Sequence, residues 1–260
     1  MRLERVLFAL ALSASFTLLT ACGGAAQSGV KKEDAATQKQ EAARVHTELG
    51  QTYLRQGKLE MAQEKLNRAL TFDPDFVNAH TVLAVLYEQI GDATQAEVHY
   101  KRAAQLKPKS GAEQNNYGTF LCKLGRYDEA QAYFDRAITD PFYQTPAVAL
   151  TNSGTCLLHA GKREEAERRL RLALDKNPNG GEALFQLASV LYDKGEYFKA
   201  RAFMQRYEAT SQPRPDALLL GRNIELRLGN GSAAGDYTRR LLQSFPESEQ
   251  ARSLSVQGQS

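Results

Sequence analysis

A unit of about 34 residues recurs six times along this chain of 260 residues. In every copy a glycine is followed five positions later by an alanine, and successive glycines lie 34, 34, 36, 34 and 34 residues apart. The six pairs are Gly57/Ala62, Gly91/Ala96, Gly125/Ala130, Gly161/Ala166, Gly195/Ala200 and Gly229/Ala234. A period of this length indicates one small structural unit that is repeated and must bury its apolar face against its neighbours.

Each unit has the sequence pattern of two short helices. In the first unit, apolar residues recur at spacings of three and four, which predicts an apolar stripe on each helix. The small residues Gly50 and Ala62 allow the two helices to approach closely, and Gly57 suits the turn between them, because glycine accepts positive φ. Pro74 ends the second helix, since proline has no backbone N–H to donate. Further prolines follow at the ends of the later units: Pro108, Pro141, Pro178, Pro213 and Pro246.

This pattern resembles the tetratricopeptide repeat (TPR), and the resemblance covers about 80% of the chain. It implies an all-α fold, a right-handed α-solenoid of six TPR helix pairs with one continuous core. The expected units are 43–76, 77–110, 111–146, 147–180, 181–214 and 215–248. The last unit is degenerate, as is typical of a terminal cap. We expect residues 249–260 to be a polar, frayed tail.

The first residues have the pattern of a secretion signal. Arg2 and Arg5 precede an apolar stretch over 6–19 that is too short to span a membrane as a helix. The stretch ends in Leu-Thr-Ala-Cys at Cys22, which resembles the lipobox of bacterial lipoproteins. That resemblance implies a signal peptide over 1–21 and lipid attachment to Cys22. An ordinary signal peptide with a chance cysteine is the alternative.

The residues around the proposed lipid site imply a location. In lipoproteins an Asp directly after the lipidated cysteine favours the inner membrane, and this chain has Gly23 and Gly24 there. The resemblance therefore implies a lipid anchor in the bacterial outer membrane, with the protein facing the periplasm. Residues 22–42 are rich in Gly, Ala, Gln, Lys and Ser and show no clear apolar period, so we expect a flexible tether.

Neither the charge nor any motif points to catalysis or to a small ligand. The 33 basic and 30 acidic residues leave a net charge of +3, which gives no reason to expect nucleic-acid binding. The histidines, His46, His80, His99 and His159, show no i, i+4 pairing, so we expect isolated surface or groove residues and no metal site. No catalytic constellation stands out, and we expect no enzyme activity, no cofactor beyond the covalent lipid on Cys22, and no small-molecule substrate.

Cys122 and Cys156 lie 34 residues apart, in the first helices of the third and fourth units. First helices of neighbouring units lie side by side in the TPR fold, so the two side chains could approach disulfide distance. An exported protein meets an oxidising compartment that permits the bond. The alternative is two buried free thiols, which behave as small apolar side chains.

The TPR resemblance also implies a binding surface on the inner, concave side. In the family, positions 2, 5, 9, 12 and 13 of each unit line that side, and we expect it to bind a protein partner through polar groups and apolar anchors, with some of these residues completing the packing instead. The matching residues are Arg44, Thr47, Gln51, Leu54, Arg55, Asn78, Thr81, Val85, Glu88, Gln89, Asn115, Thr119, Cys122, Lys123, Val148, Thr151, Thr155, Leu158, His159, Glu182, Phe185, Ser189, Tyr192 and Asp193. Leu54, Val85, Phe185 and Tyr192 are the expected anchors.

A lipobox followed by six such units is similar to the type IV pilus biogenesis and stability lipoproteins of the PilW/PilF family, the pilotins of the pilus secretin. Chain length and the cysteine pair agree with that family. The resemblance implies that the protein binds secretin subunits and promotes their localisation and multimerisation in the outer membrane. Two alternatives remain open: a lipoprotein of the outer-membrane β-barrel assembly machinery, and a periplasmic scaffold for a cell-wall enzyme.

Overall fold

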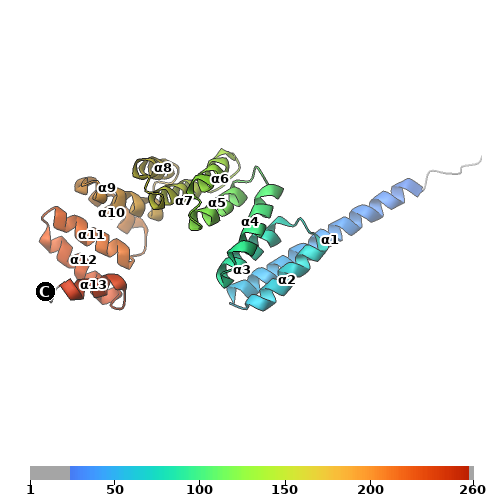
Figure 1. The fold of residues 1–260 in the computed structure, drawn as a ribbon, viewed down its shortest axis with the longest axis horizontal. Helices are drawn as coiled ribbons and strands as arrows, with labels where there is room; N and C mark the ends of the chain where they lie inside the picture. The colour runs from blue at the N-terminus through green and yellow to red at the C-terminus, as the bar shows by residue number, and fades with distance from the viewer. Residues whose placement is uncertain (1–23, 258–260) are drawn as a thin grey trace, which may run out of the picture.

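The computed structural model describes the backbone of residues 24–257 and the side chains of residues 34–254 (Figure 1). This part of the chain contains thirteen helices and no strand. Twelve of the helices form six antiparallel pairs, which confirms the all-α architecture predicted from the repeats. The pairs are α1 (Gly24–Arg55) with α2 (Leu59–Phe72), α3 (Val77–Ile90) with α4 (Ala93–Leu106), α5 (Gly111–Lys123) with α6 (Tyr127–Thr139), α7 (Pro146–His159) with α8 (Arg163–Lys176), α9 (Gly181–Asp193) with α10 (Tyr197–Thr210), and α11 (Pro215–Arg227) with α12 (Gly231–Ser244).

The turn inside each pair is built around the glycine that defines the repeat. All six of these glycines have a positive φ, between 71° and 82°, and no other described glycine does. At Gly91, which ends α3, the backbone N–H donates to the carbonyls of Tyr87 and Glu88, so the turn also satisfies the last groups of the helix. The same backbone requirement, a turn residue with positive φ, therefore recurs once in each of the six units.

The two helices of a pair touch through small residues. Each alanine five positions after the turn glycine is buried, with 3% exposure or less. On the facing helix, Gly154 is buried so tightly that an added Cβ would lie 2.8 Å from Leu170 Cγ. Side chains at these positions would push the helices apart, so the spacing of small residues in the sequence fixes the spacing of the helices in space.

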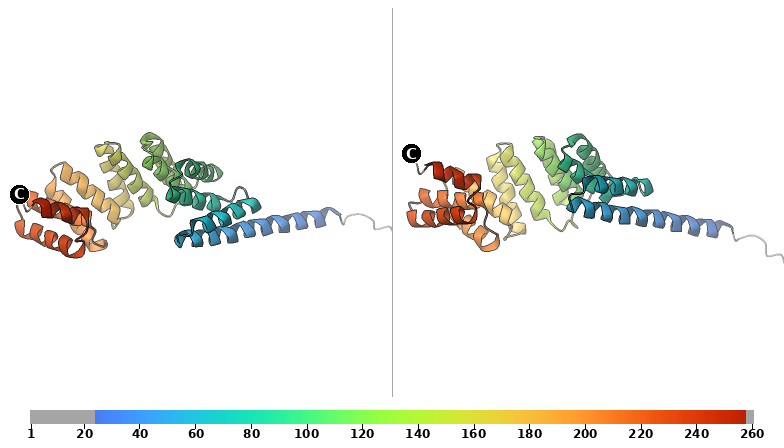
Figure 2. Two further views of the ribbon diagram at one scale, coloured as in Figure 1. Left: turned by 60° about the horizontal axis from the view of Figure 1, so that its bottom comes forward. Right: turned by 90° about the horizontal axis from the view of Figure 1, so that it is seen from below.

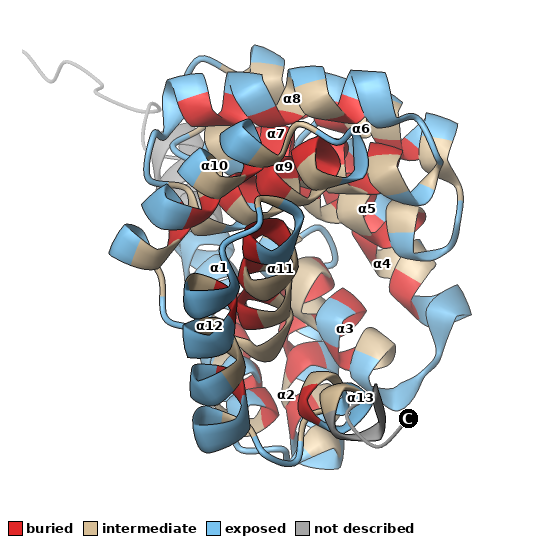
Figure 3. Cartoon of the chain, turned by 90° about the vertical axis from the view of Figure 1, so that its left-hand side faces the viewer, coloured by how far each residue is buried: buried red, intermediate tan, exposed pale blue. Residues whose placement is uncertain are grey.

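Successive pairs stack into an elongated, curved array (Figures 1 and 2). First helices contact each other across repeats, as between α1 and α3 or α5 and α7, whereas each second helix contacts the first helix of the next pair. The first helices are thus the more closely spaced row, and they line the concave side. Buried residues gather between the two rows of helices, and exposed residues cover the outside (Figure 3).

The prediction of a flexible tether is wrong for the described residues of that segment. From Gly24 onward they belong to α1, which runs for 32 residues and projects beyond the first helix pair (Figures 1 and 2). Ala, Gln and Lys, which we took for tether composition, are also strong helix formers. The helix extends from an already packed first repeat, so it avoids the cost of nucleation. Glu41, Arg44 and Glu48 form i, i+3 and i, i+4 ion pairs along it.

The prediction of a frayed tail is wrong as well. Residues 249–257 form a thirteenth helix, α13 (Glu249–Gln257), which packs against α11 and α12. Ala251 is buried there with Leu218 and Leu241, and Leu254 packs against the same cluster. The short helix covers the apolar side of the sixth pair, which has no seventh pair to pack against, so it serves as the cap of the array.

Candidate protein-binding surface

Three hollows follow one another along the row of first helices. The first lies between α1 and α3 and has a volume of about 300 Å³. The second, between α5 and α7, measures about 170 Å³, and the third, where α7 meets α9, about 250 Å³. Residues predicted from the repeat positions line all three. They are Arg44, Thr47, Gln51, Asn78 and Thr81 in the first, Thr119, Cys122, Lys123, Thr155 and His159 in the second, and Val148, Thr151 and Glu182 in the third.

The first hollow is charged and well ordered by internal bonds. The Arg44 guanidinium donates to Glu41 Oε1 and Glu48 Oε1, both at 2.5 Å. The hydroxyl of Thr47 donates to the carbonyl of Ala43 at 2.7 Å, so it can offer a partner only its acceptor capacity. This hollow therefore presents polar groups whose main partners lie within α1.

The second hollow has a disulfide in its wall. Cys122 and Cys156 are bonded, with Cα atoms 5.8 Å apart, and they join α5 to α7. Cys156 is fully buried, whereas Cys122 is half-buried and borders the hollow. On the rim, Lys123 Nζ lies 2.8 Å from Glu88 Oε1 on α3. The covalent bond and this ion pair hold three first helices together at the middle of the row.

The same hollow contains a ladder of amide and hydroxyl groups. Asn152 Nδ2 donates to Asn115 Oδ1 at 3.0 Å and to Thr119 Oγ1 at 3.3 Å. These bonds cross from α7 to α5 and fix the side chains in place. Asn152 and Thr119 thus present pre-organised polar groups in a hollow whose lining is otherwise mainly apolar, and such groups can bind a peptide without first being ordered.

The third hollow exposes more apolar surface than either of the other two. Val148 is exposed at its edge, and the backbone of Gly180 and Gly181 forms part of its wall. Farther along α9, Phe185 and Tyr192 are half-buried and pack partly on the core, and the guanidinium of Arg214 lies 4.2 Å from the centre of the Phe185 ring. These aromatic rings leave one edge at the surface, as anchors in protein interfaces commonly do.

Four of the predicted groove residues, Thr47, Leu54, Asn115 and Thr151, are buried, with 9% exposure or less, and offer little surface to a partner. Leu54, which we expected to be an apolar anchor, lies in the core with Leu66 and Leu83. Asn115 is buried, and its amide oxygen is occupied by Asn152. Leu54 stands at the twelfth position of its unit and is buried, which is favourable for an aliphatic side chain, whereas Leu158 at the same position of the fourth unit is only half-buried.

The remaining predicted residues lie on the same row of first helices outside the three hollows. Asp193, at the end of α9, is exposed and lies 4.0 Å from Arg163. The others are exposed or half-buried: Arg55, Val85, Glu88, Gln89, Leu158, Ser189 and Tyr192. The repeat positions therefore predict a continuous surface, of which the hollows are the deepest parts.

Sequence reasoning missed several residues that line the hollows, and three of them share one position of the repeat. Glu48 and Val82 border the first hollow, and Asn152 borders the second and the third. All three stand at the sixth position of their units, next to the fifth position that we used. A comparison of this position across the repeats would have found them.

The expectation of isolated histidines is wrong for one pair. His80 on α3 and His99 on α4 face each other, with their Nδ1 atoms 2.9 Å apart. His80 Nε2 donates to the Pro74 carbonyl at 2.9 Å, so His80 Nδ1 is the acceptor and His99 Nδ1–H the donor. Burial lowers the pKa of His80 below its ordinary value and lowers that of His99 to about 4. The pair is thus a neutral element of the second repeat.

Within residues 24–257, no group of three or more His, Cys, Asp and Glu side chains is arranged to hold a metal ion. The helices in this range include none with the length and apolar character needed to cross a membrane. Cys22 and the predicted signal peptide lie outside the described residues.

Comparison with known proteins supports the TPR fold and shows similarity to a protein of type IV pilus assembly. Models of the tetratricopeptide repeat match residues 50–91, 77–110, 114–140 and 157–224. The chain is 28% identical over 210 residues to the type IV pilus assembly protein PilF of Pseudomonas aeruginosa, an alignment that covers 81% of this chain and 83% of PilF.

Two solved structures extend this similarity. The crystal structure of PilW, described as a widely conserved type IV pilus biogenesis factor, superposes with a TM-score of 0.74 at 33% identity and covers 82% of this chain and 97% of PilW. The structure of Pseudomonas aeruginosa PilF superposes with a TM-score of 0.76 at 27% identity and covers 85% of this chain and 99% of that one. In both cases nearly the whole of the solved structure is matched.

Proposed function

Because this chain belongs to the family of tetratricopeptide-repeat proteins of type IV pilus biogenesis that includes PilF and PilW, we propose that it binds subunits of the outer-membrane secretin of the pilus system. By binding them it promotes their localisation and their multimerisation into the ring through which the pilus passes. The role is one of binding, without a catalytic step.

The observation that carries this proposal is the row of three hollows along the first helices. The hollows lie on one side of a continuous array and combine fixed amides with ion pairs, and the half-buried rings of Phe185 and Tyr192 follow farther along α9. Such a surface suits an extended segment of a protein, which can fill successive hollows and exchange backbone hydrogen bonds with the amides. A small molecule would need only one of them.

The proposal includes an anchor in the outer membrane through lipid on Cys22, with the array in the periplasm. Two acyl signals or more are needed for stable anchoring, and lipoprotein modification supplies them. The helical segment of α1 before the first repeat supports a defined spacing between anchor and array: residues 24–42 span about 30 Å at the rise of an α-helix.

The binding proposal is tested by capture from detergent-solubilised envelopes with the wild-type protein. We expect secretin subunits to be recovered. Recovery of β-barrel assembly subunits or of a cell-wall hydrolase, with no secretin, would overturn the proposal in favour of one of the two alternative roles. A charged substitution in the third hollow, Val148→Asp, is expected to reduce secretin recovery. The matched control is Val98→Asp on α4, because Val98 is 54% exposed and Val148 47% exposed, but Val98 lies in the row of second helices.

The anchor is tested separately with Cys22→Ser. This variant is expected to remain soluble in the periplasm, to retain secretin binding in solution, and to yield few secretin rings in the outer membrane. Unchanged ring assembly would contradict the proposed role of the lipid, while leaving the binding role intact.

A further inference from the structure

An arginine recurs at one position of the second helix in five of the six units. It is the twenty-sixth residue of each unit, and only the fourth unit differs, with Leu172 there. The five arginines are Arg68, Arg102, Arg136, Arg206 and Arg240.

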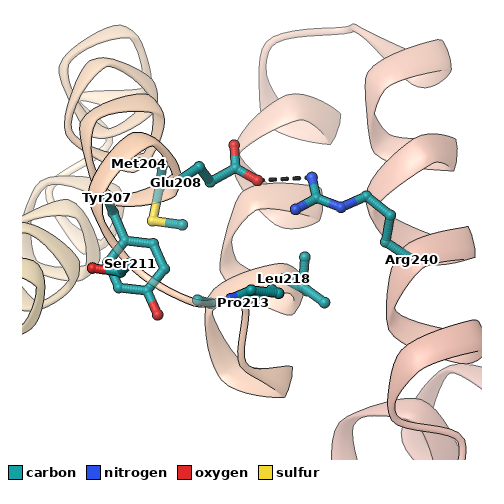
Figure 4. Close-up of a pocket in the computed structure, with 8 residues that line it drawn as sticks. Met204, Tyr207, Glu208, Ser211, Pro213, Leu218 and Arg240 are labelled. Carbon is teal, nitrogen blue, oxygen red and sulfur yellow. Dashed lines mark hydrogen bonds and ion pairs between the residues drawn. The ribbon is translucent and has the colours of Figure 1, made fainter.

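Three of these arginines bind an acceptor on the preceding unit. Arg102 pairs with Asp75, and Arg206 Nη2 donates to the carbonyl of Pro178 at 2.7 Å. Arg240 Nη1 lies 2.7 Å from Glu208 Oε1, as Figure 4 shows. The recurring guanidinium thus joins one repeat to the next by a charge-assisted bond.

Arg136, at the junction of the second and third units, has no such acceptor. Lys109 stands at the position that Asp75 occupies in the first unit, and Ala104 at the position that Glu208 occupies in the fifth. The Arg136 guanidinium lies over the Tyr133 ring, 4.7 Å from its centre, and forms no ion pair with any described residue. Lys107 and Lys109 also lack ion pairs in the described part of the chain. The segment between α4 and α5 thus carries two lysines next to the Arg136 junction, whereas two of the three equivalent junctions supply a carboxylate and the third a backbone carbonyl.

A hollow lies at the junction where the internal carboxylate is absent. It has a volume of about 360 Å³ and is lined by Ala104, Gln105, Pro108, Gln114, Tyr133 and Arg136. The equivalent place between the fifth and sixth units holds only about 40 Å³, and the Glu208–Arg240 pair lies beside Pro213 and Leu218 there (Figure 4). At the second–third junction the place of Glu208 is taken by Ala104 and the place of Leu218 by Gln114, so the larger hollow coincides with the loss of the internal carboxylate.

The hollow also contains a polar group without a partner. Gln114 is only 2% exposed, and its Nε2 donates to the carbonyls of Ala104 at 3.0 Å and Lys107 at 3.3 Å. These two bonds fix the amide, because the opposite orientation would place its oxygen against two carbonyls. Gln114 Oε1 is consequently buried with no hydrogen-bond partner. In the last three units the same position holds the buried leucines Leu150, Leu184 and Leu218, so a polar side chain is not required for packing.

We propose that this hollow binds an acidic segment of a partner protein. A carboxylate of the segment takes the place of the missing internal acid and bonds to the Arg136 guanidinium, with Lys107 and Lys109 adding attraction. An N–H of the same segment donates to Gln114 Oε1, which becomes reachable when the exposed Arg136 side chain moves off Tyr133. The site lies on the row of second helices, so it is an interaction surface additional to the proposed secretin-binding row.

A peptide fits the hollow better than a lipid headgroup does. The hollow offers one guanidinium, one buried acceptor and apolar walls from Ala104, Pro108 and the Tyr133 ring. The anionic headgroup of phosphatidylglycerol has no N–H to satisfy Gln114 Oε1, and that of phosphatidylethanolamine has no net negative charge for Arg136, whereas an acidic peptide carries both a carboxylate and backbone N–H groups. Charge complementarity and the acceptor together favour an acidic polypeptide.

The test uses the full chain and a fluorescein-labelled peptide of alternating glutamate and alanine, with fluorescence anisotropy at low salt as the readout. Saturable binding is expected, and Arg136→Gln is expected to weaken it by roughly tenfold or more, since a charge-assisted bond is lost. Arg206→Gln is the matched control, because Arg206 occupies the same position of its unit and is already bonded to Pro178. It is expected to bind the peptide as the wild type does.

A second variant gives Arg136 a carboxylate partner from this chain itself. Lys109→Asp restores the acid that Asp75 supplies at the first junction, so it is expected to pair with Arg136 and abolish peptide binding while the helical circular dichroism signal is retained. Binding that survives in Lys109→Asp, equal losses in the Arg136 and Arg206 variants, or no saturable binding at all would overturn the proposal. Binding to vesicles of phosphatidylethanolamine and phosphatidylglycerol without binding to the peptide would also overturn it and assign the basic cluster to a lipid surface.

Discussion

Removal of the Cys122–Cys156 bond is expected to destabilise the middle of the array. The bond closes a loop with a sequence separation of 34 residues. The loss of loop-closure entropy in the unfolded chain predicts a contribution of about 3.5–4 kcal/mol for a loop of this size. For a chain of this length, that corresponds to a fall of about 7–15 °C in the melting temperature.

The substitution that isolates this effect is Cys122→Ser. Cys122 is half-buried at the edge of the second hollow, whereas Cys156 is completely buried, so an exchange at Cys122 disturbs the packing less. Thermal unfolding followed by circular dichroism, with and without a reductant, measures the effect. We expect the wild type to lose stability on reduction and Cys122→Ser to be insensitive to the reductant.

Hydrogen exchange adds a spatial test of the same reasoning. Because repeats contact only their neighbours, the loss of protection is expected in α5 to α8, with less change in α1 and α12. The reasoning would be refuted if the wild type melted at the same temperature with and without reductant. Reaction of both thiols with a maleimide in denaturant, without prior reduction, would show that the bond is not formed at all.

Two further predictions concern packing and pH. Gly154→Ala would place a Cβ 2.8 Å from Leu170 Cγ. We therefore expect the free energy of unfolding, measured in urea, to fall by about 0.5–2 kcal/mol after the gain in helix propensity is counted. The control is Gly235→Ala, whose Cβ would meet nothing within 4 Å, and it is expected to raise the free energy of unfolding by up to about 1 kcal/mol. The His80–His99 pair resists protonation in the folded state, because burial lowers both pKa values, that of His99 to about 4. The unfolded chain therefore binds more protons below the ordinary histidine pKa, and the stability that the neutral pair contributes is expected to be present above about pH 6.5 and to be lost as pH falls toward 4. A melting temperature that shows the same dependence on pH in the wild type and in His99→Asn would contradict this assignment.

The repeat architecture could be predicted from the sequence because one backbone requirement recurs at a fixed spacing. The six turn glycines and the alanines five positions later are local signals, and each has the predicted conformation or burial. The residues proposed to bind a partner were placed from the same register, although the register alone does not reveal which of their side chains are buried in the core and which are exposed. Leu54 is the clearest case, since its aliphatic side chain gains more from the core with Leu66 than from the groove.

Both ends of the array were predicted less well, for a shared physical reason. Residues 24–42 and 249–257 have polar compositions that alone would suit disordered segments, but each is joined to a packed element that stabilises a helix. In α13 the signal is only the spacing of Ala251 and Leu254, three residues apart, which is too short a pattern to distinguish from chance. The helices form because a neighbouring packed surface offsets the entropy that an isolated segment of this length would lose.

The histidine pair and the free arginine show different limits. The contact between His80 and His99 joins the two helices of one unit, and it depends on side-chain directions that a one-dimensional pattern does not specify. The unpaired state of Arg136, in contrast, is visible when the units are aligned on one another, because Lys109 then falls on Asp75 and Ala104 on Glu208. In this repeat protein, alignment of the units is therefore sufficient to locate the arginine that lacks an internal acceptor.

The continuity of α1 changes how an anchor at its start would act. A random-coil tether would let the array sample all directions, so partner binding would depend only on the effective concentration near the membrane. The helix instead runs without a break from Gly24 into the first repeat, where Ala43 is already buried against α2 and α3. An anchor at the start of such a helix sets the distance of the first hollow from the membrane and couples its orientation to that of the helix. The direction in which the row of hollows faces then depends on the helical segment before the repeats as well as on the repeats themselves.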